Sequence, residues 1–332
     1  MNGHYIIKIN NKCNSNCSFC ADSKEVRKQA DIEYDKLISE LIKNRKKFDS
    51  LIISGGEPTI YKNIFKYIKY AKKKCKYKKI ILTTNGFLLA YEKFTDKLIK
   101  NGVDSFIISF LTHEKKKYFE ISKIKNSFNY INKAISNIKK RKKEINVNIV
   151  IHKLNYKNIE KTVEFLINKK INSIQFSFIN PIGSSIINDK SIITERMSKV
   201  ILHLKSAINY GIEKNYNNIF IENIPICIAP TLIKKISDLK KPKENKKYYN
   251  SSKIKLEKCK ECIHNQICDG IWKAYHQQFG DSEFKPILKK KELKIKLIMP
   301  PRYYNGTNDL TPIMSYSTAK LTSLLALSNG SK

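Results

Sequence analysis

The chain has 332 residues, of which 41% are hydrophobic, and a formal net charge of +35 at pH 7. This length fits one large domain with a smaller one beside it. The apolar runs at 5–7 and 322–328 are too short for a signal peptide or a membrane span, so we predict a soluble, cytoplasmic protein. The lysines are scattered without the aromatic motifs of RNA-binding modules. The charge therefore leaves nucleic acid open as a partner without establishing it.

The first 210 residues alternate β-rich runs with amphipathic helical patterns. The expected strands are 4–10, 50–56, 79–86, 105–110, 145–151 and 173–179. The expected helices are 32–46, 62–74, 92–101, 127–142, 157–169 and 194–211. Six β–α units in series predict a parallel sheet with right-handed crossovers.

Polar residues follow several of the expected strands, at Gly55-Gly56-Glu57, Thr84-Asn85-Gly86, Ser109, Asn155 and Asn180-Pro181. A barrel gathers all its strand ends around one mouth, whereas a doubly wound sheet concentrates its site at one switch point. The distribution favours a barrel. We therefore predict an α/β fold in which residues 1–212 form a partial (β/α)6 barrel.

The pattern changes beyond residue 212. Residues 213–296 contain a lysine-rich, low-complexity segment followed by closely spaced cysteines. This is typical of a small, loop-rich cysteine-knuckle domain that is held together by metal rather than by a large core. Residues 297–332 are polar and weakly patterned, as expected of a partly mobile tail.

The chain holds eight cysteines, and clustered cysteines in a reducing compartment indicate metal binding rather than disulfides. A C-x3-C-x2-C triplet follows the first strand directly and comprises Cys13, Cys17 and Cys20. Three thiolates can hold three irons of a [4Fe–4S] cluster and leave the fourth iron open. The alternative is zinc, completed by a distant histidine. Cys75 stands alone in a lysine-rich segment and is interpreted as a structural thiol.

Two motifs resemble the radical S-adenosylmethionine (SAM) superfamily: CNSNCSFC at 13–20, with the aromatic Phe19 before its last cysteine, and GGEP at 55–58. The resemblance implies that the open iron binds SAM, which is reductively cleaved to a 5′-deoxyadenosyl radical that takes a hydrogen atom from substrate. It implies that Gly55, Gly56, Glu57 and Pro58 hold the methionine end, with Glu57 in a charge-assisted pair with the ammonium. Four further residues lie at strand ends where the family lines its cofactor pocket: Thr84, Asn85, Ser109 and Asn155. The resemblance implies that they contact SAM, and the alternative is that they are ordinary polar residues at strand ends.

A second group, Cys259, Cys262 and Cys268, resembles the SPASM/Twitch extensions of this superfamily, which carry auxiliary clusters. Trp272 stands where SPASM proteins have a further cysteine, so we expect one auxiliary [4Fe–4S] cluster, with Cys227 as its available fourth ligand. A structural zinc site with four cysteine ligands is one alternative. In another, Cys227 stays free as a hydrogen-atom donor beside an open iron. His264 lies in the same segment and is a competing ligand.

The resemblance implies a radical SAM enzyme that acts on a peptide or protein, as a ribosomal-peptide maturase does, with a reductase, ferredoxin or flavodoxin as electron donor. A small biosynthetic metabolite or RNA stays open as the substrate. From another class, the chain could be a non-catalytic iron–sulfur or zinc protein. GGEP argues against that interpretation, because an electron carrier has no use for a methionine-binding turn. No P-loop, dinucleotide-binding or zinc-protease motif supports other enzyme classes.

Overall fold

The computed structural model describes residues 4–180, 195–240 and 252–288. Its main feature is one sheet of seven strands, all parallel, in which the spatial order follows the order in the chain. The strands are β1 (His4–Lys8), β2 (Ser50–Ser54), β3 (Lys79–Thr84), β4 (Ser105–Ser109), β5 (Glu144–Ile151), β6 (Ser173–Phe178) and β7 (Ile219–Glu222).

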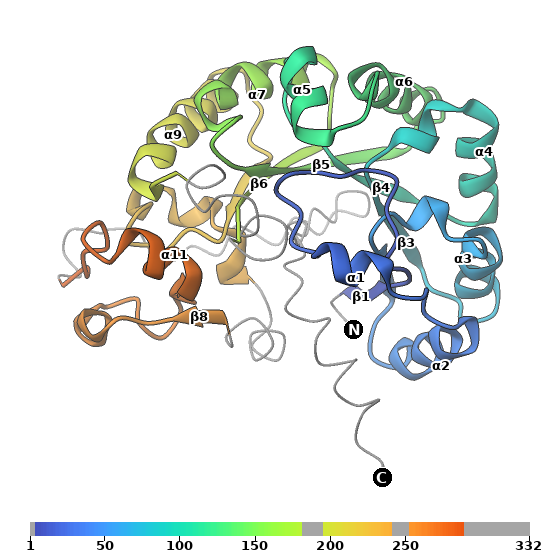
Figure 1. Ribbon diagram of the computed structural model, residues 1–332, viewed down its shortest axis with the longest axis horizontal. Helices are drawn as coiled ribbons and strands as arrows, with labels where there is room; N and C mark the ends of the chain where they lie inside the picture. The colour runs from blue at the N-terminus through green and yellow to red at the C-terminus, as the bar shows by residue number, and fades with distance from the viewer. Residues whose placement is uncertain (1–3, 181–194, 241–251, 289–332) are drawn as a thin grey trace, which may run out of the picture.

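Helices cover the outer face of this sheet, which curves into an arc (Figure 1). They are α2 (Tyr34–Arg45), α3 (Ile64–Lys73), α4 (Glu92–Asn101), α5 (Lys115–Ser122), α6 (Ser127–Lys140), α7 (Ile159–Asn168) and α9 (Met197–Glu213). The short helix α1 (Lys24–Lys28) lies instead inside the arc (Figure 1). Short 3-10 turns lie at η1 (Pro58–Ile60), η2 (Phe87–Ala90), η3 (Tyr156–Asn158), η4 (Pro230–Lys235) and η5 (Ser237–Lys240). A sequential, curled parallel sheet with helices outside is a partial barrel, which confirms the predicted fold class.

All six expected strands and all six expected helices are present. The strand β7 was missed, because its four residues IFIE make a shorter β-rich run than the others. Helix α9 continues to Glu213 and β7 pairs with β6, so the sheet extends past the expected boundary at residue 212. The predicted tail at 297–332 lies outside the described residues.

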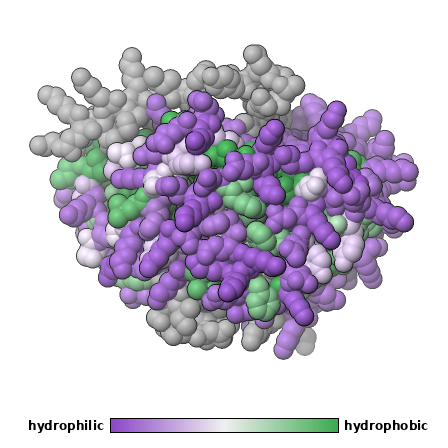
Figure 2. Space-filling view, turned by 90° about the horizontal axis from the view of Figure 1, so that it is seen from above, coloured by the Kyte–Doolittle hydropathy of each residue, from purple (hydrophilic) through white to green (hydrophobic). Residues whose placement is uncertain are grey.

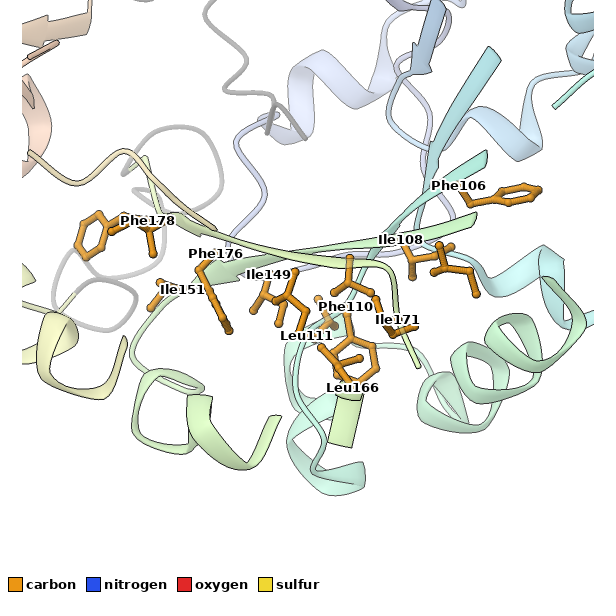
Figure 3. Packing of buried hydrophobic residues seen from close by; sticks show 14 of the residues in the cluster. Phe106, Ile108, Phe110, Leu111, Ile149, Ile151, Leu166, Ile171, Phe176 and Phe178 are labelled. Atoms are coloured by element: carbon orange, nitrogen blue, oxygen red, sulfur yellow. The ribbon is translucent and has the colours of Figure 1, made fainter. Parts of the chain in front are cut away.

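The two faces of the sheet differ in chemistry. The outer face packs apolar side chains against the helices; Figure 3 shows Phe106, Ile108, Ile149, Ile151 and Phe176 on this side. The inner face of β1–β4 carries a separate apolar layer made of Ile6, Ile52, Ile81 and Ile107.

Polar side chains replace this apolar layer on the inner face of β5–β7. Ser177 Oγ lies 2.9 Å from Asn148 Oδ1 and 3.0 Å from the buried Glu222 Oε2, which links three neighbouring strands. The inside of the half-barrel is thus apolar under the first strands and polar under the last ones.

The C-terminal segment forms a small unit against the end of the barrel. It comprises β8 (Lys253–Ile254), η7 (Glu257–Glu261), β9 (Ile271–Trp272) and α11 (Lys273–Phe279). Its contact with α9 is made by Tyr275, whose hydroxyl accepts a 2.8 Å hydrogen bond from Met197 N, and by Glu283, whose carboxylate accepts a 2.8 Å bond from Ser198 N. Its buried apolar side chains, Ile271, Trp272, Tyr275 and Phe284, belong to the same core cluster as those of the barrel.

Hydrophilic side chains dominate the molecular face that Figure 2 shows. Within the described part of the chain, none of the helices combines the length and the apolar character that a membrane span needs.

Candidate functional site

The first three cysteines lie in the loop between β1 and α1, which the end of α5 holds in place. Asn16 N and Ser18 N donate 3.3 Å hydrogen bonds to the carbonyls of Ser122 and Ile121. The hydroxyl of Ser15 donates to Ser122 O at 3.0 Å. These contacts fix the backbone of the loop that carries Cys13, Cys17 and Cys20.

The GGEP turn at the end of β2 is bonded to the same loop. Gly56 N donates to Asn10 O at 2.9 Å, and Glu57 N donates to Lys12 O at 2.8 Å. A Cβ atom on Gly56 would lie 2.3 Å from Lys12 O, and one on Gly55 would lie 2.0 Å from Asn10 Oδ1. Only glycine permits this close approach of two backbones. The two motifs that carry the resemblance therefore touch each other directly.

Glu57 is buried, with 1% of its surface exposed, and its carboxylate is held by several donors. Oε1 accepts from Thr59 Oγ1 and Thr84 Oγ1 at 2.6 Å each and from Thr59 N at 3.1 Å. Oε2 accepts from Asn85 N at 2.7 Å. Burial raises the pKa of Glu57, and these hydrogen bonds act against that shift. Because Oε2 has one donor, it is the oxygen with capacity for the ammonium of SAM, a contact that stays a prediction.

Three other residues predicted to line the cofactor pocket lie at the ends of β2, β3 and β4. Asn85 Nδ2 donates to Asn14 Oδ1 at 2.8 Å, which ties the end of β3 to the cysteine loop. Pro58, which is buried, begins η1 directly after Glu57. Ser109 ends β4 and, by strand alternation, shares the inner face with Ile107.

Asn155 serves the backbone in this structure. Its Nδ2 donates to Leu111 O at 3.0 Å and to Val150 O at 2.9 Å, and its Oδ1 accepts from His152 N at 3.0 Å. Both amide hydrogens are used, so Asn155 clips the ends of β4 and β5 together. Its predicted contact with SAM remains untested.

The thiols of the first loop are buried enough to disfavour the thiolate. Burial is the largest cause of a rise in the pKa of Cys13 to about 12, and the charge of Glu57 adds to it. Burial likewise raises the pKa of Cys17 to about 11 and also raises the pKa of Cys20. Since metal ligation requires the thiolate, bound iron would have to supply the positive charge that releases these protons. Three soft sulfur ligands in one loop fit an iron–sulfur cluster.

A histidine that the sequence analysis left without a role lies beside this loop. His152 follows β5 directly and is 2% exposed. Its ring stacks on Phe19, with centroids 5.4 Å apart and planes inclined by 18°. Its position at a strand end, three residues before Asn155, is the signal that could have identified it.

The four remaining clustered cysteines line one pocket between the C-terminal unit and the segment after β7: Cys227, Cys259, Cys262 and Cys268. Burial, followed by the three neighbouring cysteines, raises the pKa of Cys227 to about 12. His264 also lines the pocket. Trp272, which stands where SPASM proteins have a further cysteine, is 1% exposed and belongs to the core. The structure thus brings together the residues predicted for the auxiliary site.

The described residues do not form a site for a single metal ion. Across residues 4–180, 195–240 and 252–288, no three His, Cys, Asp or Glu side chains converge tightly enough to hold one ion.

Residues 7–166 match the family model described as the radical SAM superfamily. Over these residues the chain carries a radical SAM domain. Among curated relatives, it is 32% identical over 169 residues to a probable GTP 3′,8-cyclase of Methanocaldococcus jannaschii, covering 48% of this chain and 53% of the relative. The chain spans between 30% and 70% of the lengths of the first three curated relatives that it matches.

Solved structures share the fold. Streptococcus suis SuiB bound to S-adenosylmethionine aligns with a TM-score of 0.60 and 19% identity, covering 86% of this chain and 76% of SuiB. SuiB bound to its precursor peptide SuiA aligns with a TM-score of 0.56 and 22% identity, covering 69% of this chain and 51% of that one. The shared fold confirms the expected partial barrel. The match over residues 7–166 indicates an enzyme of the radical SAM type, a family that implies a [4Fe–4S] cluster and SAM.

Proposed function

We propose that the chain binds a [4Fe–4S] cluster through Cys13, Cys17 and Cys20 and cleaves SAM reductively to begin radical chemistry on a substrate. The observation that carries this proposal is the direct bonding of the cysteine loop to the GGEP turn at two backbone positions. When bound, the cluster and SAM supply an electron and a 5′-deoxyadenosyl radical, and the protein supplies their positioning.

The chain's own residues have definable tasks in this proposal. The three cysteines hold the cluster, while Gly55, Gly56 and Pro58 shape the turn beside it. Glu57 offers Oε2 to an ammonium group, because Oε1 already accepts three hydrogen bonds and Oε2 accepts one. The apolar inner layer of β1–β4 excludes water from beneath the site, which protects a reactive radical.

We propose an auxiliary [4Fe–4S] cluster in the C-terminal pocket, ligated by the four cysteines that line it. The shared pocket and the mutual influence of their thiols support this assignment. The expected division, with the barrel at 1–212 and the auxiliary unit at 213–296, stays part of the proposal. So do a cytoplasmic location and electron supply by a reductase, ferredoxin or flavodoxin.

For the substrate, we propose a peptide or protein. The supporting observation is that the likeness to SuiB, which binds a precursor peptide, extends over 86% of this chain. A second candidate is a small metabolite such as GTP, because the curated relatives include probable GTP 3′,8-cyclases that match about half of the chain. RNA stays a third choice that depends on the positive charge alone.

The test starts with anaerobic purification, reconstitution with iron and sulfide, and addition of dithionite and SAM. We expect 5′-deoxyadenosine from the native chain and none from the variant Cys13→Ala, Cys17→Ala, Cys20→Ala. GTP and the peptides encoded beside the gene are then added separately, and the substrate is the one that accelerates SAM cleavage and gains a new mass. Zinc instead of iron after anaerobic expression would refute the radical mechanism.

A further inference from the structure

Lys253, the first residue of β8, is a buried cation. It is 7% exposed, the least of any lysine or arginine among the described residues. Its Nζ lies 4.5 Å from the ring centroid of Trp272, its partner on β9. Within the described part of the chain, it forms no ion pair with a carboxylate. A buried charge without a counter-charge is unfavourable, so we expect an anionic group to face this ammonium.

The hollow beside Lys253 shares a wall with the cysteine pocket. Its volume is about 10 Å³, and Asp238, Asp269 and Cys268 line it together with Lys253. Cys268 also lines the pocket of the four clustered cysteines. A space of this size holds at most one water, so no larger anion can enter it to pair with Lys253. The two aspartates line the hollow without forming an ion pair with Lys253. The ligated cysteine site is then the remaining source of negative charge at this hollow.

The backbone brings β8 close to Cys268. Gly270 has a positive φ of +82°, and a Cβ atom on it would lie 2.1 Å from Ile254 O, so only glycine permits this approach. Burial raises the pKa of Cys268, and the charge of Asp269 adds to the rise. Backbone hydrogen bonds to the sulfur and the charge of Lys253 act in the opposite direction. The sulfur of Cys268 is thus close enough to the ammonium to respond to its charge.

The charge of an iron–sulfur site depends on its oxidation state. A [4Fe–4S] cluster with four thiolate ligands carries a net charge of about −2, and about −3 after it accepts one electron. A fixed positive charge beside one ligand therefore stabilises the reduced state more than the oxidised one. Burial strengthens this effect, because little water lies between the charges to screen them.

We propose that the ammonium of Lys253 is the fixed counter-charge of the auxiliary cluster, and that it raises the reduction potential of this site so that it accepts an electron more readily. The inference rests on the proposed auxiliary cluster and adds to it a residue that is not a ligand. Lys253 acts through its charge beside Cys268. Trp272, which stands where SPASM proteins have a further cysteine, provides the ring against which the ammonium rests.

The test isolates the auxiliary cluster in the triple-alanine variant of the first cysteine loop, which should hold about four irons. In this background, Lys253→Met removes the charge and keeps a long apolar side chain, while Lys253→Arg keeps the charge. Lys260→Met is the matched control. Lys260 lies between two of the ligands in sequence, but its side chain is 72% exposed and paired with Glu257. Each protein is reconstituted anaerobically, its iron is counted, and the electron paramagnetic resonance signal of the reduced cluster is followed in a mediated redox titration.

We expect Lys253→Met to shift the reduction equilibrium about tenfold toward the oxidised cluster, which makes the potential about 59 mV more negative for one electron. A nearby charge with little screening has an effect of this order. Lys253→Arg should stay within about threefold of the background, because it keeps the positive charge. Lys260→Met should stay within about twofold, because water screens an exposed and paired charge. The iron content should be the same in all four proteins.

An unchanged potential in Lys253→Met with full iron would refute the inference and leave the proposed function intact. Equal shifts in Lys253→Met and Lys260→Met would also refute it, because burial would then not matter. Zinc in the triple-alanine variant, or no iron in it beside about four in the native chain, would overturn the auxiliary cluster and the inference with it. If Lys253→Met loses its cluster, Lys253→Arg decides: full iron at the background potential supports the counter-charge, whereas loss of iron in both variants refutes it.

Discussion

The two cysteine sites of this protein are built in opposite ways. The N-terminal loop is bonded to β2, β3 and α5, all parts of the large barrel core. The C-terminal cysteines lie in a unit whose own sheet consists of the two short strands β8 and β9. The first site is thus positioned by the barrel around it, while the second lies in a small unit that is attached to the barrel mainly through α11 and Glu283.

We therefore expect metal at the first site to contribute mainly to function and metal at the second site to contribute also to folding. Removing iron from the first loop would leave its hydrogen bonds to the barrel in place. Removing it from the second would leave four half-buried thiols around a pocket, three of them in a unit with only two short strands. Metal binding energy in such small units is folding energy.

The largest expected effect is on the C-terminal unit when iron is removed by a chelator. We expect residues 252–288 to lose protection from hydrogen exchange, because their structure depends on the ligated metal. The strands β1–β7 should keep theirs, since their ladder and apolar core do not depend on the cluster that the loop after β1 would hold. Mass spectrometry of exchange before and after chelation measures both regions in one sample. Equal loss of protection in the barrel would contradict the distinction between the two sites.

Gly56→Ala is expected to disable the first site selectively. The new Cβ would lie within 2.7 Å of backbone atoms of Asn11 and Lys12, so the cysteine loop has to move away. Iron should fall from about eight to about four per chain, because one of two clusters is lost. SAM cleavage should fall by at least about 100-fold, since small misplacements cost that much.

The control for this substitution is Gly280→Ala. Gly280 has a positive φ of +68°, but no atom lies within 4 Å of the added Cβ. Its backbone conformation is one that only glycine adopts readily, so the change should cost about 1–3 kcal/mol in unfolding free energy without loss of iron. Full iron content in Gly56→Ala would show that the loop does not need the close approach.

Cys227→Ala is expected to weaken the auxiliary site and leave the first one intact. Because Cys227 is the predicted fourth ligand, its loss should lower the iron content toward about four per chain and leave SAM affinity unchanged. Cys75→Ala is the matched control, since Cys75 packs half-buried against the core far from both groups in sequence. If Cys227→Ala keeps all its iron but forms less product, the free-thiol alternative for Cys227 gains support.

The sequence predicted what is local and missed what depends on distant contacts. The cysteine spacing and GGEP are contiguous patterns, and short β-rich runs between helical patterns identified six of the seven strands of the barrel sheet. The hydrogen bonds that Thr84 and Asn85 make to Glu57 join two strand ends, so no pattern within either segment could reveal them. His152 was missed for the same reason, because its partner Phe19 comes from the other end of the barrel sequence.

The smallest expected effect is a dependence of the free energy of unfolding on pH, which His152 beside the first site would cause even in the iron-free protein. The pKa of His152 is about 3 in the folded chain and about 6.5 in an unfolded one. Between these values the unfolded chain binds a proton that the folded chain does not, so the free energy of unfolding decreases as pH falls below about 6.5. Urea unfolding of the iron-free protein at two pH values, about 7.5 and 5.5, should show about 1 kcal/mol of this loss. His152→Phe should lack that contribution, while the control His203→Phe, at a histidine that packs against Tyr156, should retain it. An identical pH dependence in His152→Phe and the native chain would mean that His152 is solvated, and that the packing against Phe19 does not isolate the first site from water.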